Sequence, residues 1–286
     1  MAMKVLITGA GGQLGRDTVL ACAAAGDDVF GFDHSTLDVI DRDAVLGCVT
    51  SLRPDAVIHC AAWTAVDACE SDIDKAFAAN ALSVRWMVEG CARVGAHLVQ
   101  VSTDYVFDGN KPAPYHEWDA TNPTSVYGAS KLAGEDEALA LGASAAVART
   151  SWVCGEFGNN MVKTIMRLAA ERDALAFVDD QVGHPSLCAD LGPMLRRLAL
   201  DRRSGVHHVT NQGAVSWFEF AQSVVTAMGK SPSMVSPIAT ADMQSPRLAK
   251  RPANSVLDNS VLRGAGIHLL PDFRESLGRL VRRLTV

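Results

Sequence analysis

The 286-residue sequence has no run of apolar residues near the roughly 20 that a membrane-spanning helix needs. The apolar stretch Val5-Leu6-Ile7 ends within a few residues at a glycine turn, so we expect no signal peptide either. These absences predict a protein of the cytoplasm that has no membrane partner.

Paired cysteines are also missing. The seven cysteines lie at positions 22, 48, 60, 69, 91, 154 and 188, with no CxxC pair and no spacing typical of metal ligands. An odd, dispersed set in a chain without a signal sequence is typical of reduced, mostly buried thiols. We therefore expect no metal site, and the thiols agree with a cytoplasmic location.

The chain has no basic excess. Its formal net charge is −6, whereas a duplex-binding surface usually carries a surplus of Lys and Arg. The basic pairs at 196–197, 202–203 and 282–283 fall at the ends of expected helices, where a solvated face or a helix dipole accounts for them. We expect no nucleic-acid partner.

Up to about residue 150 the sequence alternates short β-branched runs with longer Ala-rich helical patterns. The expected strands are 4–8, 28–33, 56–60, 97–102 and 145–149, and the expected helices are 14–25, 41–52, 72–94 and 126–142. Such alternation implies right-handed βαβ crossovers, and nearly all-apolar strands indicate burial on both faces. The pattern predicts an α/β fold with a Rossmann-type, doubly wound parallel sheet.

Beyond residue 150 the alternation weakens. Helical patterns near 158–171, 187–200 and 216–228 are separated by extended segments at 175–178 and 207–210 and by proline-rich loops. We expect residues 1–150 to form an NAD(P)-binding Rossmann domain. Residues 151–286 are expected to form mainly a smaller C-terminal substrate-binding lobe, with some segments returning to the Rossmann domain.

A glycine-rich turn follows the first expected strand and opens a helix. Gly9, Gly12 and Gly15 would permit a tight turn and close approach of the backbone to a pyrophosphate at the helix N-terminus. Asp33 ends the second strand, where an acid can bind the adenosine ribose and disfavour a 2′-phosphate. His34 and Ser35 offer groups that could bind that phosphate, so NADH and NADPH both stay open as cofactors.

Tyr127 and Lys131 form a YxxxK pair on one face of an expected helix. An adjacent ammonium favours the phenolate and should bring the pKa of the tyrosine toward neutrality, which suits proton transfer to a ketone oxygen. Ser102 or Thr103 follows the fourth strand, at the edge where doubly wound sheets bind ligands. Together with the glycine turn, these residues predict an NAD(P)-dependent carbonyl reductase.

At these residues the chain resembles the extended short-chain dehydrogenase/reductases, and within them the dTDP-4-dehydrorhamnose reductase family. The Ser-Thr-Asp-Tyr-Val-Phe block at 102–107 and the Arg-Pro-Ala-Asn-Ser block at 251–255 are the most specific matches. Further matching segments lie at 11–15, 61–67, 70–71, 80–81, 127–135, 149–153, 179–183 and 185–186.

The resemblance implies roles for individual residues. For the cofactor it implies contacts from Gly12, Gln13 and Leu14 at the pyrophosphate, Asp38 and Val39 at the adenine, Ala62, Trp63 and Thr64 beside the nicotinamide, and Tyr127 and Lys131. For a dTDP-sugar it implies contacts from Thr103, Asp104 and Trp152, with Arg251 at the diphosphate, where a guanidinium binds in a bidentate way. The implied reaction reduces the 4-keto group of dTDP-4-dehydro-L-rhamnose, with Tyr127, Lys131 and Thr103 as catalytic residues.

The chain departs from the family pattern at three positions. His184 stands where relatives often have a small apolar residue, and it either alters sugar selectivity or is a solvated loop histidine. Asp17 and Asp190 stand near the helix positions at which some relatives have glutamates, which are associated with a magnesium-bridged dimer. Their shorter side chains argue against that metal and that dimer, while a homodimer of another kind stays open.

Two alternatives remain at this point. A sister reductase, such as the dihydrostreptose-type synthase, would act on another nucleotide deoxysugar with the same residues. A non-catalytic regulatory subunit, like the β-subunit of methionine adenosyltransferase, would share the fold and the motifs; the intact Tyr127, Lys131 and Thr103 argue against it.

Overall fold

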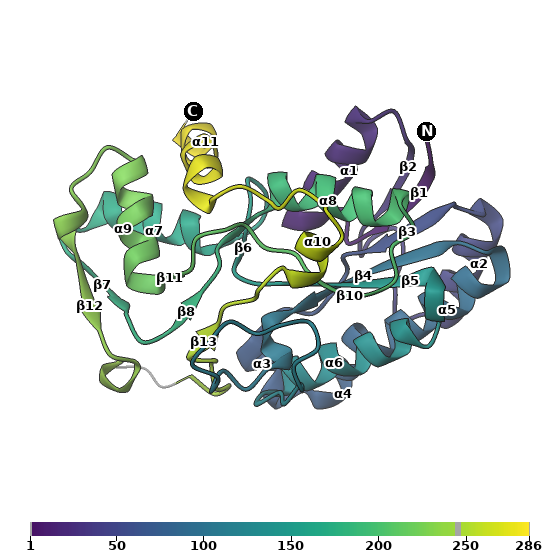
Figure 1. The fold of residues 1–286 in the computed structure, drawn as a ribbon, viewed down its shortest axis with the longest axis horizontal. Helices are drawn as coiled ribbons and strands as arrows, with labels where there is room; N and C mark the ends of the chain where they lie inside the picture. Colours follow the sequence, from purple (N-terminus) through teal and green to yellow (C-terminus); the bar gives the residue numbers. More distant parts are fainter. Residues whose placement is uncertain (1, 244–246, 286) are drawn as a thin grey trace.

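A six-stranded parallel sheet forms the centre of the computed structural model, which describes residues 2–243 and 247–285 (Figure 1). The strand order is β10-β5-β4-β3-β1-β2, in which the crossover from β2 to β3 marks the doubly wound topology. The strands are β1 (Lys4–Thr8), β2 (Asp28–Phe32), β3 (Ala56–His59), β4 (His97–Thr103), β5 (Ala145–Thr150) and β10 (Gly205–His208). The prediction of a Rossmann-type α/β fold is confirmed.

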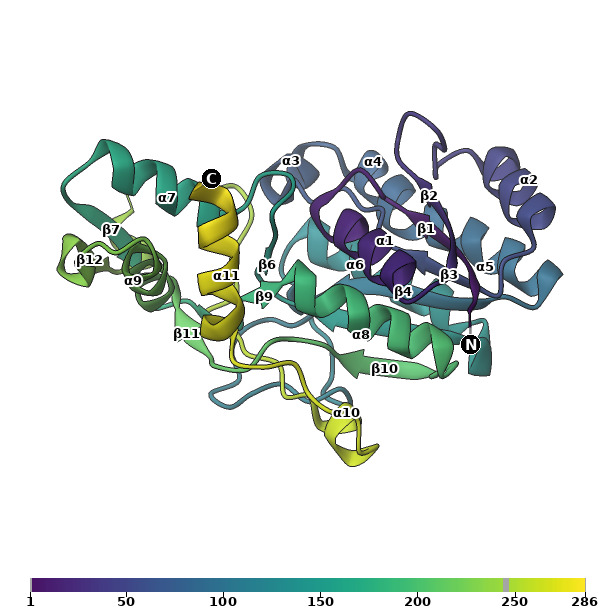
Figure 2. The same ribbon diagram turned by 90° about the horizontal axis from the view of Figure 1, so that it is seen from above.

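Helices cover both faces of the sheet. Alternate side chains of each strand point to opposite sides, so each face contributes to a separate core. From β1, Val5 and Ile7 pack into the core beneath α1 (Gln13–Ala24) and α8 (Cys188–Leu200). Leu6, between them, joins the opposite core. The helices on that second side are α2 (Arg42–Leu52), α5 (Ser83–Val94) and α6 (Val126–Leu139), and Figures 1 and 2 show the two helical layers.

The single helix expected over 72–94 is divided. The structure has α3 (Val66–Ser71), α4 (Ile73–Phe77), a π-helical turn η1 (Ala78–Leu82) and then α5. The π-helical turn carries Asn80, whose side-chain amide makes two hydrogen bonds to the backbone of Trp63. It accepts from the Trp63 N–H at 2.8 Å and donates to the Trp63 carbonyl at 3.1 Å. A side chain contact thus accompanies the extra residue in this turn, which helical periodicity alone does not reveal.

A second hydrophobic core lies beside the sheet, toward the C-terminal part of the chain. Phe220 and Phe273 are fully buried there, between α7 (Met161–Glu171), α9 (Trp217–Ala227) and α11 (Phe273–Thr285). Figure 2 shows these helices at the end of the molecule away from α2. The remaining elements are β6 (Val153–Cys154), β7 (Leu175–Val178), β8 (Val182–Gly183), β9 (Ser186–Leu187), β11 (Val215–Ser216), β12 (Val235–Ile238), β13 (Asn254–Ser255) and α10 (Ser260–Gly264).

Within the described part of the chain, no helix has both the length and the apolar character needed to cross a membrane. The seven cysteines are free thiols, and five of them are buried. The strand expected at 207–210 begins at Gly205 and joins the main sheet beside β5.

Candidate active site

The glycine turn between β1 and α1 leaves backbone donors free at a helix N-terminus. Gly9 has φ +66°, and a side chain on Gly15 would lie only 2.1 Å from the Gly9 carbonyl oxygen, so both positions require glycine. Gly12 is the N-cap of α1, and no described side chain caps that helix. Its first N–H groups are therefore available to an anion such as a phosphate.

Next to this turn, a cavity of about 680 Å³ contains the residues expected around the adenosine. Asp33, Asp38 and Val39 line it, together with Ala62 and Trp63. The Asp33 carboxylate accepts hydrogen bonds from the Ser35 hydroxyl at 2.6 Å and the Ser35 N–H at 2.9 Å, and these bonds hold its pKa below the usual range. Asp33 therefore presents a fixed negative charge to this cavity.

A second cavity, of about 420 Å³, begins at the same glycines and extends toward the C-terminal part. The two cavities share Gly9, Gly12 and Ala62, so one elongated ligand can occupy both. The structure brings most of the expected residues together in the second cavity: Gly9, Gly12, Gln13, Leu14, Ala62, Thr64, Thr103, Asp104, Tyr127, Lys131 and Trp152.

Tyr127 and Lys131 come from the first two turns of α6, a helix that Ser125 caps by accepting from the Gly128 N–H at 3.1 Å. Burial raises the pKa of Tyr127, and a hydrogen bond with Thr103 opposes this effect. The Lys131 ammonium donates to the Val101 carbonyl at 2.7 Å, and burial lowers its pKa to about 8.

The Lys131 ammonium was expected to lower the pKa of Tyr127, but in this structure burial has the largest effect and raises it. Here the phenol is held protonated by burial, and its ring packs edge-on against Tyr105 with centroids 5.4 Å apart. Among the described residues, no hydrogen bond joins Tyr127 to Lys131.

Thr103 ends β4 and faces the cavity beside a buried acid. Its hydroxyl donates to the Asp104 carboxylate at 3.0 Å and accepts from the Tyr105 N–H at 3.2 Å. Burial raises the pKa of Asp104 to about 6, although hydrogen bonds from Ser255 and Thr103 lower it. The site thus holds a hydroxyl, a phenol and an acid that titrates close to neutrality.

Trp152 occupies a strained position two residues after the end of β5. Its φ of 46° lies in the left-handed region, which bulky residues rarely adopt. The ring stacks on Trp217 with centroids 3.6 Å apart, and both rings line the second cavity. Trp217 was not identified as a site residue from the sequence. Its local signal is the capping box of Ser216 and Glu219, which makes Trp217 the first residue of α9.

Arg251 does not share this cavity. It lines a neighbouring cavity of about 440 Å³ with Arg247, Lys250 and Gln181. Its guanidinium binds the Asp67 carboxylate in a bidentate way, at 3.1 Å and 2.7 Å. The structure therefore gives Arg251 an anionic partner of the chain's own.

His184 is buried, and the interpretation as a solvated loop histidine is wrong. Its ring lies 3.4 Å from the Thr210 hydroxyl, its carbonyl accepts from Ser151, and it is not among the residues that line the second cavity. Burial lowers its pKa to about 4.

Asp17 and Asp190 are surrounded by other groups of the protein. Burial raises the pKa of Asp17, while Asp190 accepts from the Asn211 amide at 2.7 Å. Over residues 2–243 and 247–285, no three His, Cys, Asp or Glu side chains gather closely enough to hold a metal ion.

Comparisons with known proteins show the family of the chain. The family model described as "RmlD substrate binding domain" matches residues 3–286. A dTDP-4-dehydrorhamnose reductase of Aggregatibacter actinomycetemcomitans is 40% identical over 89% of this chain and 90% of its own length. A Streptomyces antibioticus protein named a probable dTDP-4,6-dihydroxy-2-methyloxan-3-one 4-ketoreductase is 40% identical over 96% of this chain and 93% of its own length.

Among solved structures, dTDP-4-dehydrorhamnose reductase of Bacillus anthracis in complex with NADP superposes with a TM-score of 0.94. It is 38% identical and covers 99% of this chain and 100% of its own chain. The chain belongs to the RmlD family, together with the dTDP-4-dehydrorhamnose reductases.

Proposed function

We propose that this protein is an NAD(P)H-dependent oxidoreductase that reduces the 4-keto group of a dTDP-4-dehydro-6-deoxy-L-hexose, converting dTDP-4-dehydro-L-rhamnose to dTDP-L-rhamnose. One observation carries the proposal: a single cavity is lined both by the glycine turn and by Thr103, Tyr127, Lys131 and Trp152. The names of the relatives agree with this activity.

The residues of the chain fit a dinucleotide. The uncapped N-terminus of α1 suits the pyrophosphate, and the cavity lined by Asp33, Asp38 and Val39 suits the adenosine. When bound, NADH or NADPH would supply a hydride from the nicotinamide, which would lie beside Ala62 and Thr64 in the second cavity, whereas Trp63, between them in the sequence, lines the first. Asn80 fixes this last segment through its two hydrogen bonds to Trp63.

Tyr127 is proposed as the proton donor to the substrate oxygen. Because burial raises its pKa, the phenol carries the proton that the developing alkoxide must receive. Thr103 would hold the same oxygen through its hydroxyl. The positive charge of Lys131, one helical turn away, would stabilise the phenolate that remains.

The sugar and the nucleotide would be bound by the C-terminal part, which we propose as the substrate-binding lobe. Trp152 and Asp104 line the cavity where the sugar would lie. Arg251 is proposed to bind the diphosphate, for which it would exchange its Asp67 partner, with Arg247 and Lys250 adding positive charge.

The test is the oxidation of NADH or NADPH with dTDP-4-dehydro-L-rhamnose. Loss of a positioned acid typically costs about 10²–10⁴-fold in rate, so Tyr127→Phe should lower kcat by that factor and leave cofactor binding intact. A variant that keeps its full activity would remove Tyr127 from this role. If the wild-type protein binds the sugar nucleotide without turnover, the proposal is wrong and a regulatory subunit is favoured.

A sister 4-ketoreductase is the second candidate. It is favoured by the Streptomyces antibioticus protein, which is as similar to this chain as the Aggregatibacter reductase is. A panel of dTDP-4-keto sugars, compared by kcat/KM, separates the two, since the true substrate should exceed the others by at least tenfold.

A further inference from the structure

A buried carboxylate lies one helical turn beyond Lys131, on the same face of α6. Glu135 is only 1% exposed and Lys131 only 3%. Residues four apart on a helix are neighbours, so the carboxylate and the ammonium interact away from bulk water. The proposed function gives Glu135 no role, although an unpaired buried carboxylate would be costly.

Arg149 and Ser102 hold this carboxylate. Arg149 Nε lies 2.9 Å and 3.1 Å from the two oxygens of Glu135, and Arg149 Nη2 lies 2.6 Å from one of them. The Ser102 hydroxyl donates to the same carboxylate. Ser102 of β4 and Arg149 of β5 are register partners, so Glu135 binds two adjacent strands just before their carboxyl ends.

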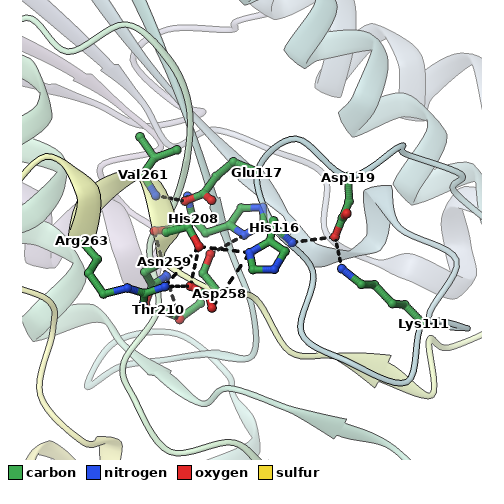
Figure 3. A network of polar contacts seen from close by, with 11 residues as sticks. Lys111, His116, Glu117, Asp119, His208, Thr210, Asp258, Asn259, Val261 and Arg263 are labelled. Carbon is green, nitrogen blue, oxygen red and sulfur yellow. Dashed lines mark hydrogen bonds and ion pairs between the residues drawn. The ribbon is translucent and has the colours of Figure 1, made fainter.

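Arg149 is itself fixed from its other side. Its guanidinium lies over the Phe107 ring at 5.1 Å, and His208 of β10 is its register partner. The backbone N–H of His208 donates to the Glu117 carboxylate at 3.2 Å, and Nδ1 of its ring lies 3.0 Å from the Asp258 carbonyl oxygen. Figure 3 shows His208 with Glu117 and Asp258, whose contacts with it join the loop around Glu117 to the segment around Asp258.

Other titratable groups also face Lys131. Cys60 and His59 approach it from the end of β3, and Tyr127 precedes it by one turn of α6. Burial lowers the pKa of His59 to about 3 and raises that of Cys60 to about 12, so both groups are neutral at pH 7. Glu135 is therefore the group that brings negative charge to Lys131 from these elements.

We propose that Glu135 is a positioning residue of the reductase site: clamped by Arg149 and Ser102, it keeps the Lys131 side chain charged and directs it at the end of β4. The proposal rests on the function proposed for Tyr127 and Lys131. Glu135 touches neither the sugar nor the cofactor in it and acts through Lys131.

The direct test is a pH titration of Lys131 by NMR, with lysine labelled with ¹³C at Cε. The chain has seven lysines, and Lys131→Arg assigns the signal. Lys131 of the wild-type protein should titrate near pH 8. In Glu135→Gln the midpoint should fall by about one pH unit or more, because the nearest carboxylate is gone.

Glu137→Gln is the matched control, since Glu137 lies on the same helix and pairs with the exposed Arg85. It should leave the titration unchanged. Glu135→Asp keeps the charge and should restore most of the wild-type midpoint. If Glu135→Gln does not fold because Arg149 is left unpaired, the double variant Glu135→Gln/Arg149→Met is compared with Arg149→Met. Both proteins lack the guanidinium, so the Lys131 midpoint should be lower in the double variant, which also lacks the carboxylate.

An unchanged Lys131 midpoint in Glu135→Gln, or equal midpoints in the double variant and Arg149→Met, would overturn the proposal. The titration needs no substrate, so its outcome is independent of the reductase assay. In that assay, Glu135→Gln should lose more of kcat at pH 8 than at pH 6, since Lys131 is then neutral at the higher pH. An equal loss at both pH values indicates a merely structural role and also contradicts the proposal.

Discussion

Asp33 is the residue with which the chain should distinguish its two candidate cofactors. Its ionised carboxylate borders the cavity proposed for the adenosine, where it would repel a 2′-phosphate. Asp33→Asn keeps an acceptor for the Ser35 N–H but removes the charge. We expect the ratio of kcat/KM for NADPH to that for NADH to rise about tenfold.

The control is Asp28→Asn, at the opposite, exposed end of the same strand, which should leave the ratio as it is. If Asp33→Asn leaves the ratio unchanged as well, Asp33 only caps its turn.

Asp104 should lower the stability of the protein above pH 6. Its pKa is about 6 in the folded chain because of burial, and about 3.9 in an unfolded one. The folded state therefore binds the additional proton between these values, and the free energy of unfolding falls as the pH rises through this window. Asp104→Asn should gain up to roughly 3 kcal/mol at pH 8.

The gain should shrink as the pH falls below 6, because Asp104 is then neutral in the folded wild-type protein too. Urea unfolding of both proteins at pH 8.0 and pH 5.5 measures it. A gain of the same size at the two pH values would show that the charge of Asp104 is not its source.

Sequence reasoning could predict the positions of residues whose signal is local. Thr103 follows a strand, and Tyr127 and Lys131 lie four apart on a helix; these patterns place all three at the carboxyl edge of the sheet. The clamp on Glu135 could not be predicted, because it joins residues that only the register of β4 and β5 makes adjacent. Arg251 could not be placed either, since its contact with Asp67 spans 184 positions.

At the scale of elements, the strands of the main sheet were predicted within two residues at each end, because most of these buried parallel strands are continuous apolar runs. The short strands β6, β8, β9, β11, β12 and β13 were not predicted. The division of the segment at 72–94 was missed. Periodicity over two dozen residues averages across a π-helical turn, and the contact of Asn80 with Trp63 that accompanies it is tertiary.

The short strand β8 should determine the orientation of Trp152. A side chain on Gly183 of β8 would lie 2.6 Å from the indole of Trp152, which already has a strained backbone. Gly183→Ala should therefore displace the ring, raise KM for the sugar nucleotide several-fold and lower the free energy of unfolding by about 1–3 kcal/mol. Steady-state kinetics and urea unfolding measure the two effects.

Gly47→Ala is the matched control, because Gly47 lies inside α2 with nothing within 4 Å of the added carbon. It should stabilise the protein by about 0.5–1 kcal/mol and leave KM unchanged. If Gly183→Ala behaves like Gly47→Ala, the contact with Trp152 does not orient the ring.

At the scale of the whole molecule, buried histidines should make the fold sensitive to acid. Burial lowers the pKa to about 3 for His59 and His208 and to about 4 for His97 and His184. In the unfolded chain each would titrate near 6.5. Between pH 6.5 and pH 4 the unfolded state therefore binds protons that the folded state does not, and acid favours unfolding.

Each of these histidines should lower the free energy of unfolding by about 1.4 kcal/mol per pH unit below 6.5. Asp104 acts in the opposite direction, but it is one group and the histidines are four, so their effect is the larger one. Urea unfolding at pH 7.5, 6.5 and 5.5 should thus give a steep loss of stability below pH 6.5. His97→Gln removes one titrating group, so its loss per pH unit should be smaller by about 1.4 kcal/mol whatever its stability at pH 7.5. The exposed His268→Gln is the control and should keep the wild-type slope. A free energy of unfolding that stays constant from pH 7.5 to 5.5 would mean that these rings become protonated without unfolding of the chain.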